Sequence, residues 1–208
     1  MLKLIVFDCD GVMFDSKQAN IAYYNHLLQR FSLQPMSEEE EIFVHMGSVA
    51  DSIDHIFHKA PEVSRKAIQQ YQSEIGYGPF LKYMKMESDL IEFLETVQKS
   101  YKLAISTNRS NTMIPLLQEH DLEKYFDKVV TALTAKRPKP APDGLLEILK
   151  HFQCDPTEAI FIGDSIFDEQ QATACGVDLI AFKNQDLKSK YSVNSFLQIL
   201  SLPPLQSL

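Results

Sequence analysis

The sequence predicts an α/β fold in which a parallel β-sheet is covered by helices on both faces and an all-helical domain is inserted after the first strand. Three observations support this prediction. An apolar run over residues 2–7 stops abruptly at a charged loop, as a buried parallel strand does. Strand and helix patterns alternate in the C-terminal part of the chain, which is typical of parallel sheets. About 70 residues with helical patterns separate the first strand from the next, and this is too long for an ordinary connection.

The N-terminal elements are one strand followed by a series of helices. The strand is rich in branched and aromatic residues and ends before Asp8. From Ser16, apolar residues recur every three or four positions, which predicts a helix with Ser16 as a candidate N-cap. A second helix begins at Ser37, where Ser37-Glu38-Glu39-Glu40 has the form of a capping box. Two more helical patterns follow at residues 49–58 and 62–75. Glycines and a proline at residues 76–79 then end the helical segment.

The remaining chain alternates between strands and helices. Short apolar runs predict the strands, and the segments between them have a helical period. Pro142 is suited to the first turn of the helix that it opens. The predicted strands cover residues 102–106, 128–131, 159–162 and 177–182. The predicted helices cover residues 90–97, a segment that ends near residue 120, and residues 142–152.

The helical insertion is expected to form a domain of its own. We place the core at residues 1–15 and 84–208 and the helical cap at residues 16–83. The chain has 208 residues, which is more than one average domain and fewer than two. A single core with a large insertion accounts for this length.

Composition argues against several classes of protein. The chain has 20 Lys and Arg against 28 Asp and Glu, a net charge of −8, which disfavours binding to a nucleic acid polymer. Its three cysteines match no metal-ligand spacing and indicate a reducing compartment, for which we expect the cytoplasm. No signal peptide is recognisable, and no apolar stretch approaches the roughly 20 residues of a membrane span. We therefore expect no membrane association.

Four clusters of polar residues fall where the predicted strands end. In an open parallel sheet the carboxyl ends of the strands share one crevice, so residues far apart in the sequence converge there. The clusters are Asp8 with Asp10, Thr107 with Asn108, Lys139, and Asp164 with Asp168.

The acidic residues suit phosphoryl transfer with a metal ion. Asp8 and Asp10 are close enough to repel each other unless one is protonated or a cation is bound. Asp164 adds a third carboxylate, and an all-oxygen site of this kind suits Mg²⁺ together with a substrate phosphate. A carboxylate can attack phosphorus to form an aspartyl-phosphate. Asp10 is placed to protonate the leaving oxygen and later to take a proton from water.

The remaining clusters offer groups that bind phosphate. The Thr107 hydroxyl and the backbone N–H of Asn108 are candidates for holding phosphate oxygens. Lys139 offers a compact positive charge to both Asp8 and the phosphate. All of these groups therefore suit one reaction.

In order and spacing, these segments resemble the four motifs of the haloacid dehalogenase-like phosphatase superfamily. They are Asp8-Cys9-Asp10-Gly11-Val12, Thr107 after Leu103-Ala104-Ile105-Ser106, Lys139-Pro140, and Gly163-Asp164 with Asp168. The resemblance covers nearly the whole chain and implies a Rossmann-like three-layer core, a helical cap and magnesium-dependent phosphoryl transfer. It also implies that Asp8 is the nucleophile and that Asp10 is the acid/base residue and a metal ligand through its backbone carbonyl. Asp164 would be a metal ligand, and Asp168 a ligand or an acid behind the ligands.

The function expected from this resemblance is magnesium-dependent hydrolysis of a small phosphomonoester. The runs Thr107-Asn108-Arg109 and Lys139-Pro140-Ala141-Pro142-Asp143 resemble the phosphoglycolate phosphatase branch. Asp10 argues against carbon–halogen cleavage, because dehalogenases lack this aspartate.

Two alternatives stay open at this point. One is a sugar phosphate mutase resembling beta-phosphoglucomutase, although Gly163 and Asn20 stand where such mutases usually have an acidic residue and a histidine. The other is a non-enzymatic phospho-aspartate signalling module. The helical insertion and the Asp8-x-Asp10 spacing disfavour that module.

The expected partner is a small phosphorylated metabolite, and the expected state is a monomer or a homodimer. The turn-like Met46-Gly47-Ser48 resembles the cap loop that meets substrate in related enzymes. Substitutions at His45 or Gly47 are therefore expected to alter substrate preference more than general activity.

Overall fold

The computed structural model describes residues 1–46 and 49–206 of the chain. These residues form two compact units. The core unit comprises residues 1–15 and 86–208, and the helical unit comprises residues 16–85. The turn expected at Met46-Gly47-Ser48 falls on residues 47–48, which lie outside the described residues.

A six-stranded sheet forms the centre of the core unit. Its strands are β1 (Leu4–Phe7), β4 (Lys102–Ser106), β5 (Lys128–Val130), β6 (Ala159–Gly163), β7 (Asp178–Phe182) and β8 (Tyr191–Val193). They lie in the order β5-β4-β1-β6-β7-β8, and neighbouring strands pair in parallel. The predicted α/β fold with a parallel sheet is therefore confirmed. Strand β8 was not predicted, because the polar Ser192 interrupts its three residues and leaves no apolar run.

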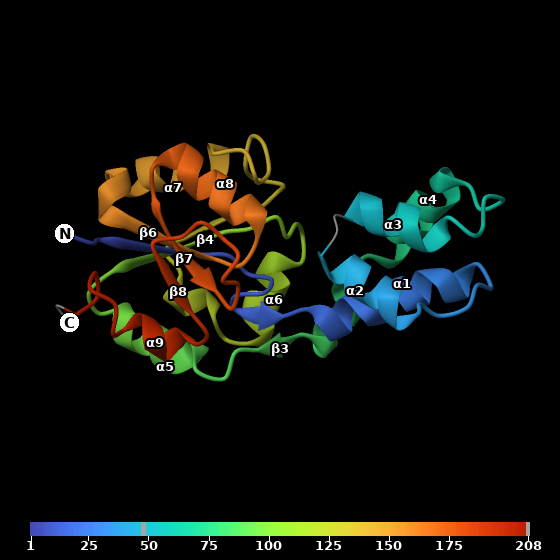
Figure 1. The fold of residues 1–208 in the computed structure, drawn as a ribbon, viewed down its shortest axis with the longest axis horizontal. Coiled ribbons are helices and arrows are strands. Elements are labelled where there is room, and N and C mark those ends of the chain that lie inside the picture. Colours follow the sequence, from blue (N-terminus) through green and yellow to red (C-terminus); the bar gives the residue numbers. More distant parts are fainter. Residues whose placement is uncertain (47–48, 207–208) are drawn as a thin grey trace. The chain divides into compact units, whose positions relative to one another are not determined.

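Two layers of helices enclose this sheet, and residues of β1 pack against both layers. Helices α7 (Asp143–Phe152) and α8 (Ile166–Cys175) cover one face, whereas α5 (Leu90–Val97) and α9 (Phe196–Ile199) cover the other (Figure 1). Leu4 and Val6 belong to the buried cluster that includes residues of α7 and α8. The Phe7 ring instead packs against Phe93 and Phe196, with ring centroids 6.1 Å apart in each case. Both faces of β1 are buried, which is why its sequence is continuously apolar.

The helical unit contains the four helices expected before the Gly/Pro break. These are α1 (Lys17–Arg30), α2 (Glu38–Met46), α3 (Val49–Phe57) and α4 (Arg65–Ile75), followed by the 3₁₀ helix η1 (Gly78–Tyr83). The capping box of α2 forms, because Ser37 N–H donates to Glu40 Oε2 at 2.8 Å and Glu40 N–H donates to Ser37 Oγ at 3.3 Å. Ser16 occupies the N-cap position of α1, but its side chain makes no capping hydrogen bond. Among the described residues, no helix is both long and apolar enough to cross a membrane.

Short elements complete the structure. Strands β2 (Phe14–Asp15) and β3 (Lys85–Met86) form a two-stranded sheet at the points where the chain passes from one unit to the other. Strands of two residues are too short for an alternating pattern, so the sequence did not predict them. Helix α6 and the 3₁₀ helices η2 and η3 cover Met113–Glu119, Glu123–Tyr125 and Pro156–Glu158.

Candidate active site

The two central strands place two aspartates side by side at the carboxyl edge of the sheet. Asp8 directly follows β1, and Asp164 directly follows the neighbouring strand β6. The backbone N–H of Asp8 donates to the Ile162 carbonyl at 2.9 Å, which continues the pairing of the two strands by one residue. From β1 the sheet extends to β4 on one side, and from β6 it extends to β7 on the other. A crevice is expected where the direction of the connections reverses in this way.

Three carboxylates meet at this position. Asp8, Asp164 and Asp168 each offer an oxygen within 4.8 Å of the others. Burial, reinforced by the charge of Asp168, raises the pKa of Asp8 to about 7. Burial and the charge of Asp8 raise the pKa of Asp164 to about 8. Carboxylates held this closely require either protons or positive charge to compensate them.

A buried lysine supplies part of that positive charge. The Nζ atom of Lys139 lies 2.8 Å from Asp8 Oδ1 and 2.6 Å from Asp168 Oδ1, and its side chain is only 4% exposed. Burial by itself lowers the pKa of Lys139, but the charges of Asp168 and Asp8 outweigh this effect and raise it. Lys139 therefore remains a cation between two carboxylates.

Both carboxylate oxygens of Asp168 are already engaged by the protein. While Oδ1 contacts Lys139, Oδ2 accepts hydrogen bonds from the hydroxyl and the backbone N–H of Ser165, at 2.6 and 3.0 Å. Ser165 Oγ in turn accepts from the Asp168 N–H, which completes a capping box at the start of α8. The fully buried Asp168 thus fixes Lys139 to the first turn of this helix.

Two glycines allow the acidic residues to approach so closely. Gly11 has a φ of +74°, and a Cβ atom added there would lie 1.9 Å from Asp164 Oδ2. A Cβ atom added at Gly163 would lie 2.4 Å from the Cβ of Asp168. Any side chain at either position would displace an aspartate of the site.

Thr107 and Asn108 lie after β4, and their side chains hold backbone groups. The Thr107 hydroxyl accepts the Arg109 N–H at 3.1 Å. The Asn108 side chain accepts the Lys139 N–H at 2.8 Å and donates to the Lys139 carbonyl at 3.1 Å. Asn108 therefore positions Lys139, which precedes a cis peptide bond to Pro140. Sequence reasoning considered only the backbone N–H of Asn108 and missed this function of its side chain.

The carboxylate of Asp10 pairs with an arginine that the sequence analysis gave no function. Arg109 Nε donates to Asp10 Oδ2 at 3.1 Å, and Arg109 Nη2 donates to Asp10 Oδ1. The Arg109 side chain is 5% exposed and that of Asp10 38% exposed. The two residues are 99 positions apart, so no local pattern could have linked them. The only signal in the sequence was the position of Arg109 just after Thr107-Asn108.

A buried glutamine connects the loops of the site. Gln171 of α8 accepts a hydrogen bond from the Ser106 hydroxyl and donates one to the Ala141 carbonyl, both at 2.9 Å. It therefore links the end of β4 to the loop that contains Lys139. Asn184 similarly donates to the Asp164 carbonyl at 2.8 Å. Sequence reasoning missed both residues.

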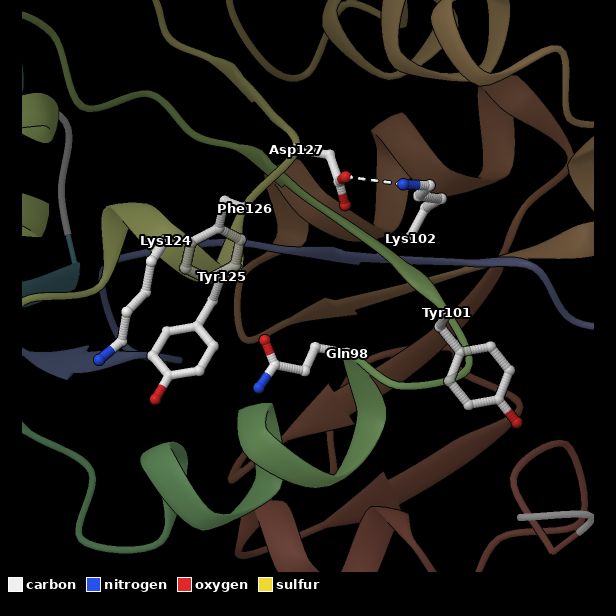
Figure 2. Close-up of a pocket in the computed structure, with 7 residues that line it drawn as sticks. All are labelled: Gln98, Tyr101, Lys102, Lys124, Tyr125, Phe126 and Asp127. Carbon is white, nitrogen blue, oxygen red and sulfur yellow. Dashed lines mark hydrogen bonds and ion pairs between the residues drawn. The ribbon is translucent and has the colours of Figure 1, made fainter.

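A separate pocket lies at the edge of the sheet where β4 begins, opposite the edge that carries the carboxylates. Figure 2 shows the side chains that line this pocket. Its volume is about 170 Å³, and Lys102, which begins β4, lines it together with Asp127. These two side chains form an ion pair at 2.9 Å. The pocket is thus distinct from the carboxylate cluster, which lies where the strands end.

Fold and site together define a class of protein: an α/β enzyme whose polar groups gather at the carboxyl edge of a parallel sheet. The sequence model of one family, the haloacid dehalogenase-like hydrolases, matches residues 5–182. The chain therefore belongs to the haloacid dehalogenase-like hydrolase family, as the resemblance of its motifs predicted.

Relatives and solved structures agree with this assignment. A phosphoglycolate phosphatase of Shigella boydii is 28% identical over 200 residues, which cover 83% of this chain and 77% of the relative. The pyrophosphatase PpaX of Bacillus pumilus is 25% identical over 177 residues, covering 84% of this chain and 80% of the relative. The crystal structure of a HAD-superfamily hydrolase, subfamily IA, variant 1, from Geobacter sulfurreducens has a TM-score of 0.86 and 33% identity. That comparison covers 96% of this chain and 95% of the other.

Proposed function

We propose that this hydrolase is a magnesium-dependent phosphatase that cleaves a small phosphomonoester through an aspartyl-phosphate on Asp8, as a phosphoglycolate phosphatase-like enzyme. The observation that carries the proposal is the setting of Asp8. It lies at the carboxyl end of the central strand, 2.8 Å from a buried lysine and within 4.8 Å of two other carboxylates. The similarity to a phosphoglycolate phosphatase supports a small phosphorylated metabolite as the substrate.

The donor atoms of the site fit a magnesium ion. Mg²⁺ prefers oxygen ligands and usually binds one or two carboxylates, water and substrate phosphate. Asp8 and Asp164 are the carboxylates whose pKa is raised, so a divalent cation would compensate charge that the protein leaves uncompensated. We assign the ion to Asp8, Asp164 and the Asp10 carbonyl, with Asp168 acting through its contacts to Lys139 and Ser165. When bound, the ion would neutralise charge on the transferring phosphoryl group.

In the first step, an Asp8 oxygen attacks phosphorus and the bond from phosphorus to the leaving oxygen breaks. Asp10 gives its proton to that leaving oxygen. Lys139 contacts Asp8 and so stands beside the phosphoryl group when it is transferred. Phosphoryl transfer depends mainly on positioning and on stabilisation of charge, and both are functions that we assign to Lys139.

The phosphoryl oxygens need donors besides Lys139. The Thr107 hydroxyl is an oxygen that both donates and accepts, and in the structure it accepts from the Arg109 N–H. Its proton is therefore available to a phosphate oxygen. We assign the backbone N–H of Asn108 to the same function, as the sequence predicts.

Asp8→Asn tests the proposal. We expect it to abolish magnesium-dependent phosphate release, because an amide cannot form the aspartyl-phosphate, while the fold is retained. Asp121→Asn, at an exposed position of the core unit, is the matched control and should keep full activity. The substrate class is tested by ranking kcat/KM for phosphoglycolate, sugar phosphates and nucleoside monophosphates. Full magnesium-dependent turnover by Asp8→Asn would refute the mechanism.

We also propose that the protein is cytoplasmic. All three cysteines lie in the described part of the chain, and none forms a disulfide. Free thiols are typical of reducing compartments, which supports the cytoplasm. Fractionation of cells that produce the protein, with a marker for each fraction, would test this.

A further inference from the structure

The ion pair between Arg109 and Asp10 has the geometry of a fixed support. Two different nitrogens of the guanidinium donate to the two different oxygens of one carboxylate. A two-point contact of this kind fixes the plane of the carboxylate as well as its position. Arg109 is almost completely buried, whereas Asp10 is more than one-third exposed. The arginine is therefore the immobile partner, and the aspartate is the one that can reach a substrate.

Three other contacts of Arg109 explain why it is immobile. Its N–H donates to the Thr107 hydroxyl, and its carbonyl accepts the Ala132 N–H, both at 3.1 Å. Its Nη1 atom donates to the Thr112 hydroxyl, also at 3.1 Å. The backbone of β4 holds the preceding residues in the sheet. Backbone and guanidinium are thus fixed independently of Asp10.

The fork of this support determines how the Asp10 carboxylate is presented. A guanidinium is planar, and its N–H groups only donate. A carboxylate held at both oxygens keeps one orientation, and its oxygens still have lone pairs that can accept a proton. A proton donor is needed when the ester is cleaved, but a proton acceptor is needed when water attacks the phosphorylated enzyme.

We propose that Arg109 is a positioning residue that orients the carboxylate of Asp10 toward the water that hydrolyses the phosphorylated enzyme. This inference rests on the proposed aspartyl-phosphate mechanism. A water oxygen forms a bond to phosphorus, and the bond between phosphorus and the Asp8 oxygen breaks. The electron pair of that bond returns to the Asp8 carboxylate. The water proton passes to an Asp10 oxygen, inorganic phosphate is released, and Asp10 is left protonated for the next ester.

The test uses p-nitrophenyl phosphate with Mg²⁺, because its leaving group departs without a proton. Under this condition kcat/KM reports formation of the phosphorylated enzyme, and kcat reports the slower step after it. For Arg109→Gln we expect kcat to fall about 10- to 100-fold. We expect KM to fall in parallel, so that kcat/KM stays within about threefold of wild type, and a burst of one nitrophenol per active site to appear. Arg109→Lys keeps the charge without the fork and should lie between wild type and Arg109→Gln.

Two further variants separate positioning from general damage. Asp10→Asn should show the same burst, and adding Arg109→Gln to it should lower kcat by less than about threefold, because nothing is left to position. Thr112→Val removes one hydrogen bond to the guanidinium and should cause a smaller loss of the same kind. Urea unfolding without metal gives a readout independent of activity. There the double variant should lose less stability than the sum of the two single variants.

A fall in kcat/KM equal to the fall in kcat, with no burst, would overturn the inference, because it would place the loss before phosphorylation. A full additional loss in the Asp10→Asn background would overturn it as well. Failure of the proposed function has a different signature. In that case wild type would release no nitrophenol that depends on Asp8 and Mg²⁺.

Discussion

Replacing Lys139 by Met removes the cation that separates two buried carboxylates while keeping most of the side-chain volume. Lys139 Nζ lies 2.8 Å from Asp8 and 2.6 Å from Asp168, so at an effective dielectric constant of about 20 each contact has a gross Coulomb energy of about 6 kcal/mol. Desolvation of the three charges offsets most of this energy. Removing one partner of a buried pair typically costs about 3–5 kcal/mol, which is the loss of unfolding free energy that we expect.

This loss should depend on pH in a defined direction. Burial already raises the pKa of Asp8 to about 7, and loss of Lys139 raises it further. An acid whose pKa is higher in the folded state than in the unfolded state contributes stability at low pH and loses it as pH rises through the folded value. The deficit of Lys139→Met relative to wild type should therefore be larger at pH 8 than at pH 5, by about 1–2 kcal/mol.

The assay is urea unfolding in the presence of EDTA at pH 5 and pH 8. EDTA is needed because a bound cation would compensate the carboxylates and stabilise the folded state. Lys99→Met, at an exposed position after α5, is the control and should change stability by less than about 0.5 kcal/mol. A variant as stable as wild type at both pH values, or a deficit that shrinks as pH rises, would refute the reasoning.

Three further predictions follow from the same geometry. Gly11→Ala should lose activity and at least about 2 kcal/mol of stability, because its Cβ would lie 1.9 Å from an Asp164 oxygen. Gly76 also has a positive φ, +61°, but open space around it, so Gly76→Ala should stay active. Mg²⁺ should raise the Tm of wild type but not that of Asp164→Asn. The rise in wild type should be larger at pH 8 than at pH 5, because Asp8 and Asp164, with pKa values of about 7 and about 8, must lose their protons to bind the ion. An equal rise in both proteins would disprove the assignment. Gln171→Leu leaves two buried polar groups without their partner, at about 1–3 kcal/mol each in urea unfolding, and unchanged stability would contradict that accounting.

The central strands of the core could be predicted from the sequence because a strand that is buried on both faces is a continuous run of apolar residues. The four residues of β1 are completely buried, and such a strand must be apolar throughout. The same pattern identified β4, β6 and β7, apart from their ends. Strands β2 and β3 have two residues each, and Ser192 interrupts the apolar residues of β8, so none of the three could be recognised in this way.

The gathering of Asp8, Asp164 and Lys139 could also be anticipated in outline. Asp8 and Asp164 follow strands, and parallel strands end at one edge of the sheet. The partners of each side chain could not be anticipated. The Asn108 side chain hydrogen-bonds to the backbone of Lys139, 31 residues away, and Arg109 pairs with Asp10, 99 residues away.

The sequence by itself therefore determined the class of fold and the candidate catalytic and metal-binding residues. Both follow from local properties, namely the hydrophobic period and the position of a residue at the end of a strand. Only the tertiary structure decided that the carboxylate of Asp168 contacts Lys139 and Ser165, and that Asp10 is paired with a buried arginine. Such choices depend on distances of a few ångström between loops far apart in the chain. A short hydrogen bond or ion pair forms only at those distances, and no periodicity of the sequence encodes them.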